Sequence, residues 1–473
     1  MIPGLIDNHA HYMRAAEYWH REVRLDGVTP HKEALDLIKH KAGESKPGEW
    51  VVVLGGWSEE QFVDEPRGFT RTELDAIAPN NPVALQLFYF RVYANSAALK
   101  AMGVEAATPD PAGIKIEKDD KGQLTGALNG GPAIGLLRDK LGAVARDKAV
   151  ENARLLMLDL NKMGITAFQD QGGTGMKASH IEAFRIAHDA GQATVRSFYN
   201  HYEEPRSAAD VDALVGRIAE LKPFQGDDWF DLTGYGETLY LPLHDALLAK
   251  AANPSAEGMK QWQRLGLALA KNGIHLNVHA QLRGSIEGLL TVMEAINKER
   301  PIKGLRWTFS HLDQAQAADL ERMKRLDIYA QIHSRPTIQG MLMFKVHGDL
   351  TYDMPPLRMI ADSGIPWGLG SDATAVTPSS PFTTLWWAVT GKMIGGKQVL
   401  RQTISREEAL IAHTRSNAAF LFQDGNLGSL APGKYADLVV LDRDYLTIPA
   451  EEISAIKPLM TMAGGRIVYN AMN

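Results

Sequence analysis

Short apolar segments alternate with longer amphipathic segments along most of the chain. Eight apolar segments are expected to be strands, at residues 4–9, 165–169, 194–199, 229–235, 275–279, 305–310, 327–332 and 366–370. Amphipathic helices are expected between most of them, for example over residues 149–163 and 257–271, each closely followed by a glycine. This alternation predicts an α/β protein in which eight parallel strands form a (β/α)8 TIM barrel.

Two regions do not fit the barrel pattern. Residues 13–148 separate the first strand from the second, far more than a crossover needs, so we expect an inserted subdomain over the barrel mouth. Within it, the glycine- and proline-punctuated segment 108–131 predicts a β-hairpin. Strand-like segments at 428–441 and 464–469 predict a small β appendage. The predicted organisation is barrel strand one at 1–12, the insertion at 13–148, the rest of the barrel at 149–424 and the appendage at 425–473.

Composition narrows the functional classes. The chain has 473 residues, of which 45% are hydrophobic and 22% charged, as in ordinary globular proteins. Its net charge of -6 argues against a general nucleic-acid binder and favours a small-molecule substrate. The longest apolar runs, such as 82–90, are too short for a membrane span. Because the chain has no cysteine, any metal must be held by histidine and carboxylate.

Metal-capable side chains stand at the carboxyl ends of four predicted strands. His9 and His11 end strand one, His279 ends strand five, His311 ends strand six and Asp372 follows strand eight. Residues i and i+2 of a strand share a face, and the carboxyl ends of barrel strands converge on one site. Imidazole and carboxylate are ligands of Zn2+, so this pattern predicts a zinc site with one or two ions. His333, after strand seven, is not included in the predicted set.

Several segments resemble one known family. They are 3–11 (PGLIDNHAH), 95–99 (NSAAL), 278–280 (VHA), 310–311 (SH), 370–373 (GSDA) and 428–438 (GSLAPGKYADL). In these the chain resembles the metal-dependent amidohydrolase superfamily, and within it amidohydrolase family 3, which includes N-substituted formamide deformylases. The resemblance implies that His9, His11 and Asp372 hold one metal. It also implies that His279 and His311 hold a second metal or act on the substrate.

The sequence departs from that family at two places. The family usually has a carboxylated lysine on strand four that bridges two metals, but no lysine stands between Lys222 and Lys250. Glu237 is the nearest carboxylate able to bridge, and the alternative is that it lies in a loop and binds water or an arginine. The family also has strands before the first motif, where this chain has only Met1 and Ile2. Either the chain is truncated, or its β-sandwich appendage is incomplete, with an exposed sheet edge.

The metal predicts the chemistry. Bound zinc would activate a water to attack an amide carbon, Asp372 would act as general base and then acid, and His311 would polarise the carbonyl. The predicted function is hydrolysis of carbon–nitrogen bonds other than peptide bonds, in amides, N-formyl or N-acyl compounds, or cyclic amides. Alternatives are a catalytically weak or silent homologue with a binding or regulatory role, and a lyase or isomerase on the same fold.

Substrate contacts are predicted from a few residues near the expected site. Arg335, just after strand seven, is expected to meet a substrate carboxylate, and Trp57 and Tyr240 to wall an apolar pocket. A homodimer is one possible assembly. A cytoplasmic location is favoured, and an exported form with a removed signal segment is the alternative.

Overall fold

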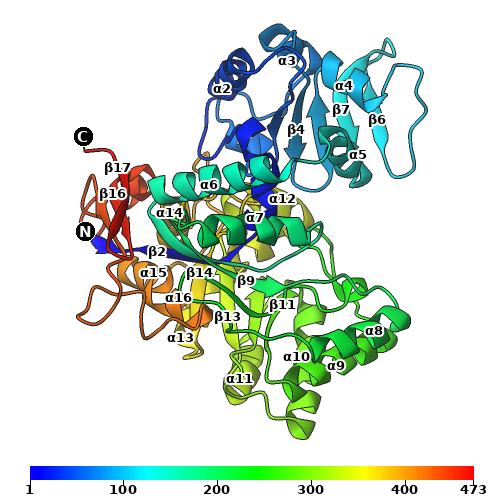
Figure 1. Ribbon diagram of the computed structural model, residues 1–473. Helices are drawn as coiled ribbons and strands as arrows, with labels where there is room; N and C mark the ends of the chain where they lie inside the picture. The colour runs from blue at the N-terminus through cyan, green and yellow to red at the C-terminus, as the bar shows by residue number, and fades with distance from the viewer. Residues whose placement is uncertain (473) are drawn as a thin grey trace.

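Eight parallel strands form the centre of the molecule. The computed structural model describes residues 1–472 (Figure 1). The strands are β2 (Leu5–Ala10), β8 (Ile165–Asp170), β9 (Arg196–His201), β10 (Phe230–Tyr235), β11 (His275–Ala280), β12 (Thr308–His311), β13 (Tyr329–His333) and β14 (Trp367–Gly370). They pair in the parallel order β2-β8-β9-β10-β11-β12-β13-β14. Each expected barrel strand overlaps an observed one, so the predicted TIM-like fold is confirmed.

The first and last strands meet just beyond their carboxyl ends. The backbone N–H of Asp372 donates to the carbonyl oxygen of His9 at 2.8 Å, and that of His11 donates to Ala373 at 2.8 Å. The buried Asp7 carboxylate adds side-chain contacts across the same seam, since it accepts bonds from the Ser371 backbone N–H at 3.0 Å and from the Ser371 hydroxyl at 2.5 Å. These bonds nearly close the barrel at the end where the predicted metal ligands lie.

Helices cover the outer face of the barrel. They are α6 (Arg146–Lys162), α7 (Ala178–Asp189), α8 (Ala208–Ile218), α9 (Ala256–Lys271), α10 (Arg283–Glu299), α11 (Ala317–Leu326), α12 (Pro336–His347), α13 (Leu357–Asp362), α14 (Pro381–Thr390), α15 (Arg406–Ala412) and α16 (Arg415–Phe420). Helix α9 shows why they form: the Ser255 hydroxyl caps its first turn, and Trp262, Leu265 and Leu269 form a buried stripe. Within residues 1–472, none of the helices has both the length and the apolar character needed to cross a bilayer.

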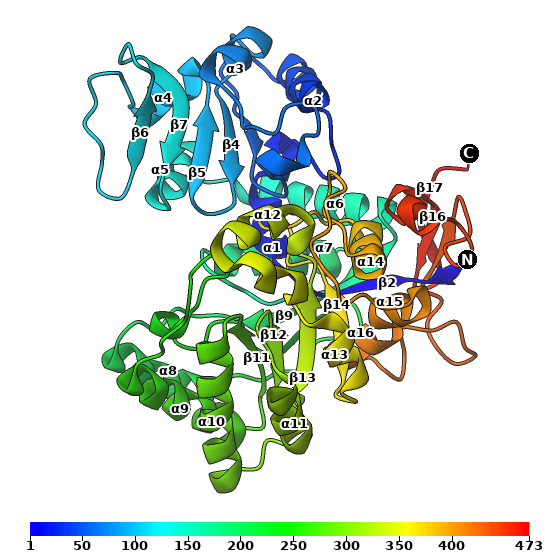
Figure 2. The same ribbon diagram turned by 180° about the vertical axis from the view of Figure 1, so that it is seen from behind.

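The segment between β2 and β8 builds a second lobe. It begins with α1 (Tyr12–Ala15) and a 3-10 helix (Ala16–Arg21), and its sheet has the order β3-β4-β5-β7-β6. The strands are β3 (Val51–Val53), β4 (Val83–Leu87), β5 (Arg91–Ala94), β6 (Lys115–Lys118) and β7 (Leu124–Asn129), and the helices are α2 (His31–Glu44), α3 (Arg71–Ile77), α4 (Ser96–Met102) and α5 (Pro132–Leu141). Antiparallel β6 and β7 form the expected hairpin. Figures 1 and 2 show this blue-to-cyan lobe at one end of the barrel.

Trp57 belongs to the core of this lobe. Its side chain is completely buried, its ring lies 5.4 Å from that of Phe69, and its indole N–H donates to the Gln86 carbonyl at 2.8 Å. The prediction that Trp57 walls a substrate pocket was wrong. Burying a large aromatic ring in the core of the lobe stabilises it more than exposing that ring would.

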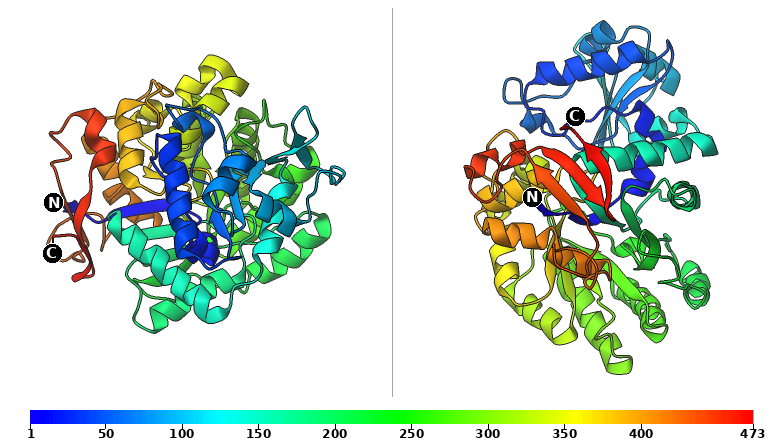
Figure 3. Two further views of the ribbon diagram at one scale, coloured as in Figure 1. Left: turned by 90° about the horizontal axis from the view of Figure 1, so that it is seen from above. Right: turned by 60° about the vertical axis from the view of Figure 1, so that its left-hand side comes forward.

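The chain ends form a small sheet at the side of the barrel. Strands β1 (Ile2–Pro3), β15 (Leu438–Leu441), β16 (Pro458–Ala463) and β17 (Arg466–Asn470) pair antiparallel in that order (Figure 3). Of the expected strand 428–441, only the last four residues form a strand. A turn precedes them at Pro432 and Gly433, where Gly433 has a φ of 90°. Strand β16 was not predicted from the sequence.

A buried arginine joins this sheet to the barrel. The Nε of Arg196, on β9, lies 3.0 Å from an Asp437 oxygen, and its Nη1 lies 2.7 Å from an Asp228 oxygen. Its guanidinium also stacks between the rings of Trp229 and Tyr435, at 4.3 and 4.4 Å. Because Asp437 is itself buried, loss of this cation would leave a buried carboxylate without its partner.

We therefore expect Arg196→Met to lower the free energy of unfolding by about 3–5 kcal/mol. The matched control is Arg217→Met, which removes a half-exposed arginine that pairs with Glu203. It should cost about 1 kcal/mol or less. Urea unfolding followed by circular dichroism measures both values, and equal losses in the two variants would contradict a special role for Arg196.

Candidate metal centre

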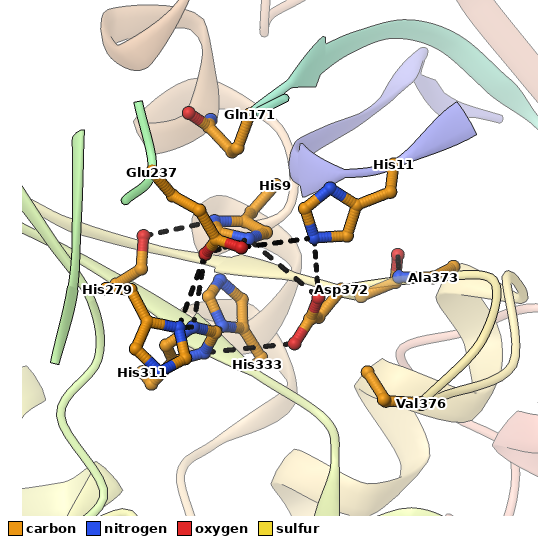
Figure 4. A network of polar contacts seen from close by, with 12 residues as sticks. His9, His11, Gln171, Glu237, His279, His311, His333, Asp372, Ala373 and Val376 are labelled. Carbon is orange, nitrogen blue, oxygen red and sulfur yellow. Dashed lines mark hydrogen bonds and ion pairs between the residues drawn. The ribbon is translucent and has the colours of Figure 1, made fainter. Parts of the chain in front are cut away.

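His9 on β2 and His11 just after it lie at the end of the barrel. Both are buried, at 0% exposure for His9 and 5% for His11. The Nδ1 atom of His9 lies 3.0 Å from the Ser310 hydroxyl, and Nδ1 of His11 lies 2.7 Å from the Gly172 carbonyl. These contacts hold each ring by one nitrogen and turn the other, Nε2, toward the centre of the site (Figure 4).

Asp372 lies beside those two nitrogens. Its Oδ1 is 3.1 Å from Nε2 of His11 and 3.8 Å from Nε2 of His9. Its backbone has the left-handed φ of 65°, and that of His311 is 80°. Non-glycine residues adopt this conformation at a cost of about 1–2 kcal/mol, which surrounding contacts must offset. The seam between β2 and β14 supplies such contacts at Asp372.

His279 and His311 form a second pair across the site. Nδ1 of His279 lies 2.8 Å from Nε2 of His311. The opposite nitrogen of His279, Nε2, lies 3.0 Å from Oδ1 and 2.9 Å from the carbonyl oxygen of Asp245. Burial lowers the pKa of His279, but the carboxylates of Asp245 and Glu237 outweigh it and raise the pKa to about 9.

Glu237 lies between the two histidine pairs. Its Oε1 is 3.5 Å from His11, and its Oε2 is 3.4 Å from His9, 3.5 Å from His279 and 3.4 Å from His311. The backbone N–H of His279 donates to the backbone carbonyl of Glu237 at 3.0 Å, so strand-like pairing continues past the end of β10. This pairing directs the Glu237 side chain into the site. The structure thus places Glu237 among the histidines, and not in a solvent-facing loop with a water or arginine partner.

The arrangement fits a cation by several independent signs. Three buried polar atoms of this site have no hydrogen-bond partner within residues 1–472: Nε2 of His9, Oε2 of Glu237 and Nε2 of His333. Leaving such atoms unsatisfied costs free energy, and a cation would satisfy them. Ligand atoms lie within 4.8 Å of one another in three groups: His9, His11 and Glu237; Glu237, His279 and His311; and His9, His311, His333 and Asp372. Because two of the groups share Glu237, the donors could hold two ions of a metal that accepts nitrogen and oxygen ligands, as zinc does.

Three site residues are absent from the set predicted from the sequence. His333 ends β13, and its Nδ1 lies 2.5 Å from Nδ1 of His311. Its place at a strand end is the same signal that identified the other histidines, so the sequence already indicated it as a candidate ligand. Asp245 supports His279, and the ring of His244 stacks on that of His279 at 3.9 Å. Both lie in an irregular loop, where no periodicity predicts which way a side chain points.

Arg335 faces the site but contacts a protein carboxylate. Its Nε lies 2.5 Å from Oδ2 of Asp372. Burial raises the pKa of Asp372, but the Arg335 charge and the hydrogen bond with His11 lower it well below its ordinary value. The prediction that Tyr240 walls a substrate pocket was wrong. Its hydroxyl donates to the Arg206 carbonyl at 3.3 Å, and its ring is buried in the hydrophobic core. Tyr240 therefore does not line the cavity described next.

A cavity of about 570 Å³ opens onto these residues. His11, Glu237, His279, Arg335 and Asp372 form part of its wall. The inserted lobe contributes another part, with Tyr89, Ile134 and Arg138. Its size suits a small organic molecule.

Comparison with known proteins agrees with this geometry. The model of a family described as the amidohydrolase family matches residues 1–469. An N-substituted formamide deformylase of Arthrobacter pascens is 27% identical, over 99% of this chain and 88% of the relative. An uncharacterized metal-dependent hydrolase from Pyrococcus horikoshii OT3 shares the fold with a TM-score of 0.65 and 19% identity, over 95% of this chain and 87% of that one. The atrazine chlorohydrolase TrzN from Arthrobacter aurescens TC1, solved complexed with zinc, has a TM-score of 0.53 and 14% identity, over 99% of this chain and 83% of that one. The match over nearly the whole length shows that this chain belongs to the amidohydrolase family.

Proposed function

We propose that this protein is a zinc-dependent hydrolase of carbon–nitrogen bonds other than peptide bonds, in amides, N-formyl or N-acyl compounds, or cyclic amides. The observation that carries the proposal is the position of Glu237 between two buried histidine pairs, with Asp372 beside them on the wall of a cavity. The relative named as an N-substituted formamide deformylase supports the reaction class.

The donor groups suggest how the metal would be held. His9, His11 and Asp372 would bind one ion, and His279 and His311 a second, with the Glu237 carboxylate between them. An anion in that position offsets the repulsion between two divalent ions in a buried site. The metal, once bound, supplies acidification of water and polarisation of a carbonyl oxygen.

Asp372 is suited to move the proton. Its carboxylate is held ionised, with Oδ1 toward His11 and Oδ2 on the guanidinium of Arg335. An ionised carboxylate can take a proton from the attacking water and return it to the leaving nitrogen. Arg335 thus acts as a positioning residue that holds the orientation of Asp372.

His311 lies between Asp372 and His279. Its Nε2 faces both His279, at 2.8 Å, and Glu237, at 3.4 Å. Burial and the nearby Arg335 and His279 hold the pKa of His311 well below its ordinary value, so its ring is neutral. A neutral imidazole can serve as a ligand, or as a hydrogen-bond donor to the oxygen on which negative charge develops.

Three predictions test the proposed function, and the first concerns the general base. Asp372→Asn should lower kcat by about 100-fold or more, because an amide cannot accept the proton. It should retain more metal than His9→Ala, since an amide oxygen still coordinates weakly. Metal analysis and hydrolysis of N-formyl, N-acyl amino acid and cyclic amide substrates measure both effects, and turnover equal to that of the parent would rule out Asp372 as the base.

The second prediction concerns metal stoichiometry. Zinc titrated into the metal-free protein by calorimetry should bind at two sites in the parent and at one in Glu237→Gln, because a neutral amide does not offset the repulsion between two ions. A stoichiometry of one in both proteins would show that Glu237 bridges nothing.

The third prediction concerns the support of His279. Asp245→Asn should weaken zinc affinity by about 10–100-fold, because it removes the carboxylate that orients and polarises the ring. The control is Asp212→Asn, which alters an exposed aspartate paired with Arg264 on the surface. Competition with a chromogenic chelator gives the affinities, and an unchanged affinity in Asp245→Asn would contradict this support.

A further inference from the structure

Two arginines on the cavity wall have no carboxylate partner. Arg14 comes from α1 and Arg138 from α5 of the inserted lobe, and both line the cavity that holds Glu237 and Asp372. Arg14 is only 8% exposed. Within residues 1–472, neither guanidinium has a carboxylate oxygen within the 4.0 Å of an ion pair.

The other buried arginine of the described chain, Arg196, binds two aspartates, and the part-buried Arg24 and Arg335 also bind carboxylates. A buried cation without an anion is costly, so such residues are normally paired. Arg14 is buried and Arg138 is part-buried, neither has an ion-pair partner within residues 1–472, and both lie on the wall of the candidate active site.

Arg14 is held in place by neutral groups. Its guanidinium donates to the Thr174 carbonyl, and its Nη2 donates to the Tyr89 hydroxyl at 2.9 Å. These bonds orient the group without forming an ion pair. Burial lowers the pKa of Arg14, but Tyr89 and the more distant carboxylates of Asp170, Glu237 and Asp372 outweigh it and raise the pKa. Tyr89 lines the same cavity and belongs to the inserted lobe, as Arg138 does.

The two cations also act on each other. Burial lowers the pKa of Arg138, and the nearby charge of Arg14 lowers it further. A compact oxyanion between two guanidinium groups would relieve this repulsion and accept hydrogen bonds from both. Carboxylate and phosphate are the two sources of such an oxyanion.

We infer that the cavity accepts a substrate that carries a carboxylate, and that Arg14 and Arg138 bind this carboxylate while the scissile carbon–nitrogen bond lies at Glu237 and Asp372. This inference rests on the proposed hydrolase function and names its substrate class: N-formyl or N-acyl compounds of an amino acid. Arg335, whose charge is engaged by Asp372, does not serve this purpose. The remaining wall, with Ile134, Ala246 and Val376, suits an apolar side chain on the same substrate.

The inference is tested with a matched pair of substrates. N-formylphenylalanine and N-formyl-2-phenylethylamine differ only in the carboxylate. The zinc-loaded parent should have a KM about tenfold or more lower for the acid, as a charged hydrogen-bonded contact predicts. Arg138→Gln should remove this preference, because it raises KM for the acid by more than it changes KM for the neutral compound.

The control is Arg154→Gln, which changes an exposed arginine on α6 away from the cavity lining. It should retain the parent's preference. Arg14→Gln is the second test variant and is used if Arg138→Gln does not reach the melting temperature of the parent. Equal KM values for the two substrates in the parent, or equal losses on both substrates in a folded arginine variant, would overturn the inference.

A binding measurement separates this inference from the hydrolase proposal. Calorimetry with 3-phenylpropionate, and with inorganic phosphate as the competing oxyanion, uses the zinc-loaded parent and the same variants. Binding of 3-phenylpropionate that weakens about tenfold or more in Arg138→Gln supports the carboxylate site even if neither formamide is hydrolysed, a result that would contradict only the hydrolase proposal. Binding that is unchanged in both arginine variants, or an arginine-dependent preference for phosphate, would overturn the carboxylate assignment.

Discussion

The site depends on the seam where the first and last barrel strands meet. Backbone bonds from Asp372 to His9 and from His11 to Ala373 hold β2 and β14 together just beyond their carboxyl ends. Asp7 strengthens the seam because its carboxylate also accepts a bond from the Tyr12 hydroxyl at 2.9 Å. Without this closure, residues more than 350 positions apart in the chain would not lie within 4 Å of each other.

Charge balance is the second constraint on the site. Glu237 and Asp372 bring two carboxylates into a buried region, where an ionised group is stable only with nearby partners. Histidines surround Glu237, and Arg335 binds Asp372, so each carboxylate remains ionised. The same groups that stabilise the charges also orient the oxygens that the proposed reaction needs, so structural and chemical roles coincide here.

The inserted lobe and the open end of the barrel together form the wall of one cavity. The barrel supplies the histidines and carboxylates, whereas the lobe supplies Tyr89 and Arg138 from elements with their own hydrophobic core. This division separates the proposed chemistry from substrate choice. A barrel can keep its metal ligands while the lobe changes which substrates enter.

By itself, the sequence determined the strand pattern and the residues at strand ends. Apolar periodicity located the barrel strands, and convergence of parallel strands was enough to predict that His9, His11, His279, His311 and Asp372 gather, as the structure places them. Glu237 was identified as the nearest carboxylate able to bridge, because the strand-four lysine of the resembled family is absent here. Local pattern carries such information because strand direction and alternation are set by neighbouring residues.

Only the tertiary structure decided the remaining features. Trp57 and Tyr240 lie in cores and not in the cavity, because burial depends on distant neighbours that no local pattern reveals. Asp245 reaches His279 from an irregular loop, which has no period to predict its direction. Arg14 on α1 and Arg138 on α5 line one cavity although they are far apart in the sequence, and this arrangement exists only after both helices have folded and packed.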